Sequence, residues 1–477
     1  MNYSSIFHIL GNLLLLVSIA MILPIAVGIY YNEPDALIFI YTTGLTFISG
    51  KILKIFKYEK TGLQYKDGFI VVTLGWFLVS IYGSLPFIMA GIFDSPVNAF
   101  FESISGFTTT GATVIMSLES LTHTILFWRS LTHWLGGMGI IVMTIAILPQ
   151  LAGNMHLFKA EVPGPLHNRI KPRIQETAKT LWFIYIFLTA AEVLLLWLNG
   201  LPLFESIIHS FGTISTGGFS SRALSVRAYD SVMIEGIIIL FMFIAGTNFT
   251  LIYDLLKGKI RRVIMDEEFR LYILLLTISI ILISINLNLH IYNDIRSAIR
   301  YAFFQVISIS TTTGFANVDY DTWPPFSRWI LLVLMFIGGS AGSTAGGIKV
   351  IRIQVLLKKG LQELHRLLHP RVIRKIKINK KVVSESVSTS ILGFFFLYIT
   401  VFVIASVVLT YFGIDIISSI SAVASTLGNI GPGLELVGPL NSYLPLPKMA
   451  KLLLSFCMIM GRLEIYTILV FLFMDWY

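Results

Sequence analysis

Four short clusters of threonine or serine with glycine are the residues of this 477-residue chain best suited to chemistry. They read SGFTTTGAT around Gly111, GTISTGGFS around Gly217, SISTTTGFA around Gly314 and ASTLGNIGPG around Gly428. Glycine reaches positive φ values that turn carbonyl groups inward. Rings of backbone carbonyls replace the hydration shell of a cation in potassium channels. The clusters therefore predict a filter for a monovalent cation, because such an ion needs dipoles rather than an acidic ring.

Aligning the clusters on these four glycines gives the expected filter. The last residue before each glycine is the expected ion ligand: Thr110, Thr216, Thr313 and Leu427. Leucine replaces threonine in the fourth copy, so the expected ring is not fourfold symmetric. The full set of expected filter residues is Thr109, Thr110, Gly111, Ser215, Thr216, Gly217, Thr312, Thr313, Gly314, Leu427, Gly428 and Asn429.

The composition indicates that these clusters lie in a membrane protein. Hydrophobic residues make up 55% of the chain and charged residues only 13%, whereas soluble proteins carry about 25% charged residues. Apolar runs long enough to cross ~30 Å of hydrocarbon predict ten spans. They lie near 5–29, 35–57, 68–92, 125–149, 179–199, 229–256, 270–290, 326–358, 388–412 and 449–473. These runs are continuous and much longer than the ~10-residue strands of a membrane β-barrel, which excludes that fold.

The net charge of +9 is distributed as in a membrane protein rather than in a nucleic-acid-binding protein. Basic residues gather in alternate connections, which predicts that these connections and both termini are cytoplasmic and that the clusters lie on the outer side. The first apolar segment, 6–29, lacks a basic start and a clear cleavage site, and we expect a retained helix. Cys457 is the only cysteine, which excludes an intramolecular disulfide and a cysteine-based metal site.

After two N-terminal spans, the chain repeats a pattern of span, short stretch, cluster and span. Each short stretch is too short to cross the bilayer, so we expect a half-helix that returns as a loop, which membranes tolerate only inside protein or along a watery path. The expected fold is all-α and polytopic, with four membrane–pore-loop–membrane repeats around one pore. The predicted segments are 1–60 (the N-terminal pair), 61–165 (loop 105–113), 166–262 (loop 213–219), 263–380 (loop 310–316) and 381–477 (loop 425–433).

A glycine-rich stretch, GGSAGSTAGG at 338–347, interrupts the third repeat's second span. A phosphate-binding loop of the GxxxxGK[ST] type is excluded, because Ile348 stands where lysine belongs and an apolar helix precedes it. The 12 residues at 326–337 rise only ~18 Å as helix, so 348–358 must complete the passage. We expect the stretch to line the pore as a hinge or gate. The expected gate residues are Gly338, Gly339, Gly342, Ser343, Thr344, Gly346, Gly347 and Arg462.

Arg462 and Glu464 in the last span have two interpretations. Either they form a mutual or interhelical ion pair that only orders the bundle, or Arg462 faces the pore below the filter. Other polar and glycine positions are expected to serve packing: Glu192 and Glu235 as interhelical hydrogen-bond partners, Arg129 and His133 in local contacts, and Gly136, Gly137 and Gly139 in close helix approach.

The sequence has no HExxH, CxxC or GxSxG motif, and we expect no enzymatic activity. His365 and His369 share a helical face in a basic loop and are expected to be solvated. This loop, 358–381, suits either anionic lipid headgroups or an acidic face of a partner protein, and the sequence does not separate the two.

The ordered set of motifs resembles the Trk/Ktr/HKT superfamily of potassium transporters, and within it the bacterial TrkH/TrkG type. The motifs are SGFTTTGAT (105–113), WLGGMGI (134–140), STGGFS (215–220), TTTGF (311–315), GGSAGSTAGGIK (338–349), GNIGPG (428–433) and GRLEIYT (461–467). The resemblance covers essentially the whole chain. It implies K⁺ as the transported ion at the four ligand residues, no cofactor on this chain, and a bacterial inner-membrane location.

The resemblance also implies a homodimer and a cytoplasmic, TrkA-like regulatory partner that binds a nucleotide, NAD(H) or ATP/ADP. It places Arg462 below the filter, next to the broken helix of the third repeat. A proton- or sodium-coupled transporter of similar architecture stays open, because such transporters also use broken helices.

Overall fold

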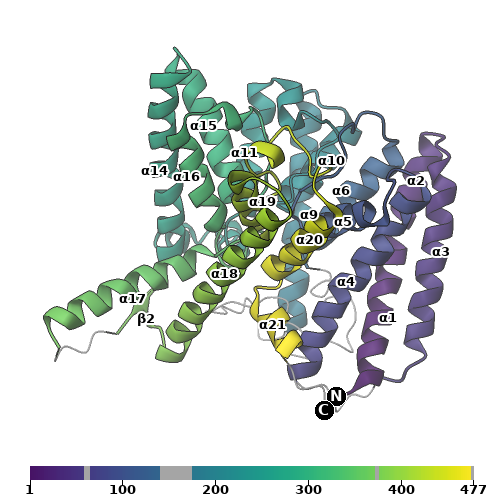
Figure 1. The fold of residues 1–477 in the computed structure, drawn as a ribbon, viewed down its shortest axis with the longest axis horizontal. Helices are drawn as coiled ribbons and strands as arrows, with labels where there is room; N and C mark the ends of the chain where they lie inside the picture. The colour runs from purple at the N-terminus through teal and green to yellow at the C-terminus, as the bar shows by residue number, and fades with distance from the viewer. Residues whose placement is uncertain (59–64, 140–173, 371–374, 474–477) are drawn as a thin grey trace.

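The computed structural model describes residues 1–58, 65–139, 174–370 and 375–473. The described part is a bundle of helices with one small two-stranded sheet (Figure 1). By length and composition, six of its helices suit a membrane span, or eight when each of two bent pairs counts as one. The chain is thus an all-α polytopic membrane protein, as its composition predicts.

The N-terminal segment forms α1 (Tyr3–Ala20), α2 (Ile22–Tyr30) and α3 (Asp35–Lys54), and α1 packs against the first helix after them. Glu33, between α2 and α3, accepts hydrogen bonds from the backbone N of His123 at 2.8 Å and of Thr124 at 2.8 Å. Burial raises the pKa of Glu33, but its hydrogen bonds outweigh burial and the net shift is downward. The negative charge of Glu33 therefore lies at a helix N-terminus, where it is favourable, and it fixes the N-terminal pair to the rest of the bundle.

Four sets of three consecutive helices follow, here called triplets. In each triplet the middle helix is short and contacts the helix before it and the helix after it. The triplets are α4 (Tyr65–Met89), α5 (Pro96–Phe107) and α6 (His123–Gly137); α9 (Ile174–Leu198), α10 (Leu203–Ile214) and α11 (Val232–Ala245); α14 (Glu267–His290), α15 (Ile295–Ser310) and α16 (Pro325–Phe336); and α18 (Glu385–Tyr411), α19 (Ile416–Gly428) and α20 (Lys448–Arg462).

The remaining described elements connect or extend the triplets. They are η1 (Ser225–Tyr229), α12 (Phe249–Leu256), α13 (Ile260–Ile264), η2 (Tyr320–Thr322), α17 (Val350–Leu368), the antiparallel strands β1 (Lys377–Ile378) and β2 (Lys381–Val382), η3 (Glu435–Val437) and α21 (Tyr466–Phe473).

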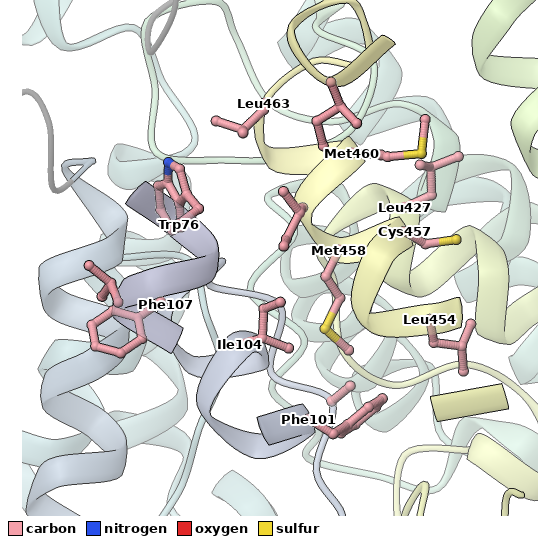
Figure 2. Close-up of a cluster of buried hydrophobic side chains, with 14 of the residues drawn as sticks. Trp76, Phe101, Ile104, Phe107, Leu427, Leu454, Cys457, Met458, Met460 and Leu463 are labelled. Carbon is pink, nitrogen blue, oxygen red and sulfur yellow. The ribbon is translucent and has the colours of Figure 1, made fainter. Parts of the chain in front are cut away.

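The contacts between triplets close a ring. The last helix of each triplet contacts the short helix of the next: α6 contacts α10, α11 contacts α15, α16 contacts α19, and α20 contacts α5. Figure 2 shows the closing contact between the fourth and first triplets, where Phe101, Ile104 and Phe107 lie opposite Leu454 and Met458. Cys457 lies in the same cluster as a buried free thiol. This arrangement brings the ends of all four short helices together.

Three of the last helices are interrupted; the sequence predicted the interruption at 338–347 but missed the breaks after α11 and α20. The bend is 106° between α11 and α12, where Asn248 caps α12 through a 2.8 Å hydrogen bond from Thr250 N. It is 113° between α20 and α21, where Glu464 and Ile465 have φ values of 55° and 49°. In the first triplet α6 ends at Gly137, and most of the predicted span beyond it lies outside the described residues.

The third interruption is the stretch 338–347. The expectation that 348–358 completes a span is wrong, since α17 runs outward from the bundle at a steep angle to α14 and α16 (Figure 1). Its side chains explain this course. α17 carries Arg352, Lys358, Lys359, Gln362, Glu363 and Arg366 among its leucines, so it is amphipathic rather than apolar all round.

Candidate ion filter and gate

The chain leaves each short helix through the same backbone conformation. One residue in each loop has a positive φ near 55°: Thr109, Thr216, Thr312 and Asn429. Two residues later a glycine follows at φ values of 82°, 76°, 77° and 107°: Gly111, Gly218, Gly314 and Gly431. A β-branched threonine at positive φ is an outlier that the surrounding structure must enforce. The same conformation thus recurs at equivalent points of all four loops, and it is strained in the three loops that have threonine there.

A hydrogen bond closes each loop back onto its helix over five residues. The donors are the backbone N atoms of Thr110, Gly217, Thr313 and Ile430, and the acceptors are the carbonyls of Ser105, Gly212, Ser308 and Ser425, at 2.9, 2.8, 2.9 and 2.9 Å. This bond and the φ pattern define which residues of the four loops correspond.

The observed register corrects the sequence alignment in the second and fourth loops. The equivalents of Gly111 and Gly314 are Gly218 and Gly431, not Gly217 and Gly428. The second loop has two adjacent glycines, and only the backbone shows which one takes the positive φ. In the fourth loop, Asn429 tolerates the left-handed conformation where the other loops have threonine.

Consequently, the carbonyls equivalent to those of Thr110 and Thr313 belong to Gly217 and Ile430. Thr216 corresponds to Thr109 instead. Leu427 and Gly428 are the last helical residues before the fourth loop, and a Cβ on Gly461 would lie 2.1 Å from the Leu427 carbonyl oxygen. The Leu427 carbonyl is therefore covered by α20.

The four loops abut one another in a closed sequence. A Cβ on Gly111 would lie 2.2 Å from the Gly217 oxygen, and one on Gly218 would lie 1.9 Å from the Thr313 oxygen. A Cβ on Gly314 would lie 1.9 Å from the Ile430 oxygen, and one on Gly431 would lie 2.7 Å from the Thr110 oxygen. Only glycine fits each position. On one side of this ring the same four glycines line a cavity of about 250 Å³.

Polar groups behind the loops hold them in place. Glu102 on α5 accepts hydrogen bonds from Val114 N at 2.9 Å and from Arg129 Nε at 2.6 Å. Arg129 on α6 donates to the Ser220 carbonyl at 2.9 Å and lies 3.5 Å from the centre of the Phe219 ring. Arg129 thus joins the first and second loops, whereas the sequence suggested only local packing, and Glu102 was not identified.

The other face of the Phe219 ring stacks on His133, with ring centres 3.9 Å apart. In the second triplet, His209 Nε2 lies 3.0 Å from Ser220 Oγ, and in the third, Gln305 Nε2 donates to Asn317 Oδ1 at 3.0 Å.

Glu235 and Glu192, the two acids expected to link helices, have different partners. Glu235 on α11 binds Arg300 on α15 at 2.7 Å, which confirms that prediction, and the buried Glu192 lies beside Thr213 of α10.

Glu102→Ala is expected to lower the free energy of unfolding in mild detergent by about 3 kcal/mol, because Arg129 would remain as an unpaired buried charge. Chemical denaturation monitored by tryptophan fluorescence measures the change. The matched control is Glu363→Ala, which removes an exposed acid 3.0 Å from Lys359 and should have little effect. Equal loss in the two variants would contradict the assigned role of Glu102.

The two ends of the glycine-rich stretch 338–347, here called the gate loop, lie next to each other. Gly338 N donates to the Ile348 carbonyl at 3.1 Å, and Ile348 N donates to the Phe336 carbonyl at 3.0 Å. Between these bonds the loop enters the break after α11, where Ser340 N donates to the Gly246 carbonyl at 2.9 Å.

The gate loop contacts three of the four filter loops directly. Thr344 Oγ1 donates to the Ile214 carbonyl at 3.1 Å, and Gly346 N donates to Thr312 Oγ1 at 2.7 Å. A Cβ on Gly346 would lie 2.3 Å from the Gly428 oxygen. The gate loop therefore covers the ring of loops on the side opposite the cavity of about 250 Å³.

Arg462 completes these contacts at the first loop. Its Nη1 donates to Thr109 Oγ1 at 3.2 Å and to the Thr344 carbonyl at 3.0 Å. Its Nη2 donates to the carbonyls of Gly136 at 2.6 Å and Gly137 at 3.0 Å. Arg462 and Glu464 do not pair with each other; Glu464 instead forms an interhelical ion pair with Arg352 of α17, as one form of the ion-pair interpretation expected.

The glycines at the end of α6 have two functions. A Cβ on Gly136 would lie 1.8 Å from the Phe107 oxygen, and one on Gly137 would lie 2.5 Å from the Tyr185 hydroxyl. This close approach was expected, but their role as acceptors for Arg462 was not. Beneath the gate loop a cavity of about 140 Å³ is lined by Gly137, Gly139, residues 342–347, Lys349, Arg462 and Glu464, among others.

Within the described part of the chain, no group of three or more His, Cys, Asp or Glu residues is placed to hold a metal ion. His369 ends α17 and is exposed, as is His365. The oxygen atoms at the ring are neutral carbonyls and hydroxyls, which suit a monovalent cation passing through.

Comparison with known proteins gives one consistent result. The sequence model of the TrkH family, described as a cation transport protein, matches residues 38–475. The chain is 43% identical to the Trk system potassium uptake protein TrkH of Salmonella typhimurium over 98% of both chains. It is 35% identical to TrkG of Escherichia coli over 97% of this chain and 96% of that protein. The crystal structure of the potassium transporter TrkH from Vibrio parahaemolyticus matches with a TM-score of 0.89 and 39% identity, covering 99% of each chain.

Proposed function

The chain belongs to the TrkH family of cation transport proteins, and from this premise we propose that it is the ion-translocating subunit of a potassium uptake system in a bacterial cytoplasmic membrane. Its relatives are named potassium uptake proteins of the Trk system. The observation that carries the proposal is the ring of four glycine loops, covered on one side by the gate loop and Arg462. A ring with a cavity on each side is the geometry of a selective pore that can close. The family is one of transporters and not of enzymes.

The ion passes between the four loops and exchanges water for backbone oxygens. In the observed register the proposed ligands are the carbonyls of Thr110, Gly217, Thr313 and Ile430. The hydroxyls of Thr110 and Thr313 are held by those of Thr108 and Thr311, each at 2.8 Å, whereas the second and fourth loops have glycine and isoleucine there. The first and third loops therefore share a threonine pair, while the second and fourth differ from them and from each other, so the ring is not fourfold symmetric in its side chains.

The gate loop and Arg462 close the path beneath the ring. The carboxylate of Glu268 at the start of α14 accepts from Ala341 N at 2.6 Å and from Ile351 N at 3.2 Å, so it ties the gate loop to the first turn of α17. Glu267 binds Lys358 of α17 at 2.5 Å. A movement of α17 is thereby transmitted to the gate loop, and a cytoplasmic nucleotide-binding subunit acting on α17 would open or close the pore. A homodimer is part of the same proposal.

The proposed topology places the cavity lined by the four glycines outside and both termini inside. The start of α1 and α21 lie at the same end of the bundle in Figure 1, which agrees with an even number of crossings. The basic residues of α17 and of the β1–β2 hairpin then face the cytoplasm.

The test is rubidium uptake by the purified full chain in liposomes. We expect uptake that non-radioactive K⁺ inhibits and that Na⁺ inhibits far less, and we expect no ATP or GTP binding by this chain alone. The same chain should restore growth at low K⁺ to a bacterium that lacks its own uptake systems. Absence of rubidium flux both from the wild type and from a variant with the gate loop deleted would refute the proposal.

A further inference from the structure

Two cationic side chains bind successive carbonyls of the gate loop. Arg462 Nη1 donates to the Thr344 carbonyl at 3.0 Å, and Lys349 Nζ donates to the Ala345 carbonyl. Both side chains line the cavity beneath the ring. The Arg462 contacts are described above as part of the closed gate, but Lys349 has no role in that description.

Among the described residues that line this cavity, the basic side chains outnumber the acidic ones. Glu464 is the acid among its lining residues, and its carboxylate pairs with Arg352. Glu268, behind the loop, is engaged by two backbone N–H groups. Lys349 and Arg462 therefore present positive charge on the path of a cation that has just left the filter, and two like charges a few ångströms apart repel strongly where little water screens them.

Lysine is suited to stand in for the transported ion. Its ammonium group is a compact monovalent cation on a flexible four-carbon stem, and it has donors but no acceptor. The Ala345 carbonyl oxygen, which accepts from it, is the ligand type that K⁺ takes from protein backbone. An oxygen that binds Lys349 in the closed loop is thus able to bind K⁺ once the ammonium has moved.

We propose that the Ala345 carbonyl is part of an inner K⁺ site that the Lys349 ammonium occupies while the gate is closed, beside the Thr344 carbonyl that Arg462 binds. The inference rests on the proposed function and adds a binding site and an occupant to the gate. When α17 moves, Lys349 moves with it, because it directly precedes the first helical residue, Val350. The Ala345 carbonyl then becomes available to an ion descending from the ring. Potassium at this site would compete with Lys349 and oppose reclosure.

The test replaces Lys349 by methionine, which keeps the stem and removes the charge. Crystals of the full chain soaked in rubidium should show anomalous density at the Ala345 carbonyl oxygen in Lys349→Met and none there in the wild type. In liposomes without a regulatory partner, rubidium influx should rise about tenfold, the effect of losing one hydrogen bond to a charged group in the closed state. Lys349→Arg should behave as the wild type.

Lys51→Met is the matched control, since Lys51 is an exposed lysine on α3, far along the chain from the gate. Lys349→Gln replaces the methionine variant in both measurements if the latter does not fold. Absence of rubidium at the Ala345 carbonyl in Lys349→Met overturns the inference, whatever the flux. Rubidium density in the wild type as well as the variant also overturns it, because Lys349 would then not be the competitor. Neither result touches the proposed function, which fails only if wild type and gate-loop deletion both conduct no rubidium.

Discussion

Replacing Gly111 by serine is expected to reduce the preference for K⁺ over Na⁺ by about tenfold or more. Gly111 has a φ of 82°, and a Cβ there would lie 2.2 Å from the Gly217 carbonyl oxygen. A residue with a side chain costs about 1–3 kcal/mol in such a conformation, and the clash adds to this cost. Both effects push the second loop away from the first, which widens the ring and spoils its fit to a dehydrated K⁺ ion.

Competition of K⁺ and Na⁺ against rubidium uptake measures the change. The matched control is Gly91→Ser, because Gly91 also has a positive φ, 65°, but a Cβ there would meet no atom within 4 Å. Gly91→Ser should keep the wild-type preference despite similar backbone strain. An unchanged preference in Gly111→Ser would count against the loops as the filter. Equal loss in both variants would assign the effect to general destabilisation.

Deleting residues 339–346 is expected to give a strong leak in the absence of any regulatory partner. The ends of the deletion already lie together, since a Cβ on Gly347 would be 3.1 Å from Gly338 N. The bonds between Gly338 and Ile348 can therefore persist while the segment over the ring is removed. If the closed state holds about 99% of the wild-type molecules, uptake should rise by up to about a hundredfold.

The leak should still prefer K⁺ over Na⁺, because the deletion leaves the four filter loops in place. This second readout separates an open gate from a damaged bundle, which would leak both ions alike. Thermal stability in detergent is the accompanying check on folding. A deletion variant that folds normally and keeps a low resting flux would contradict the role of the gate loop.

The sequence was sufficient to predict the fold class, the number and place of the four clusters, and the interruption at 338–347. These features depend on composition and on patterns that repeat along the chain. Which residues of the four clusters correspond to one another was harder to predict from the sequence. STGG contains two candidate glycines and LGNIG offers an asparagine, so the residues at positive φ in the second and fourth loops became clear only from the backbone.

The breaks at Asn248 and Glu464 were also missed, and for a related reason. Both lie in apolar runs long enough to cross a membrane, and hydropathy alone does not detect a single cap or a left-handed residue. The support by Glu102 was missed because its partners are distant in the sequence: Arg129 follows 27 residues later, and Arg129 in turn reaches Ser220. The signal available in the sequence was that Glu102 and Arg129 are charged residues in two otherwise apolar segments, where charges usually have a partner.

The reversal potential of the current through the purified chain, recorded under separate gradients of K⁺, Na⁺ and pH, tests the central claim most directly. If four carbonyl loops select K⁺ in an open path, the potential should shift by close to 59 mV for each tenfold K⁺ gradient and little with the other two. A potential that follows the pH or Na⁺ gradient would indicate coupled transport and contradict a passive K⁺ pore.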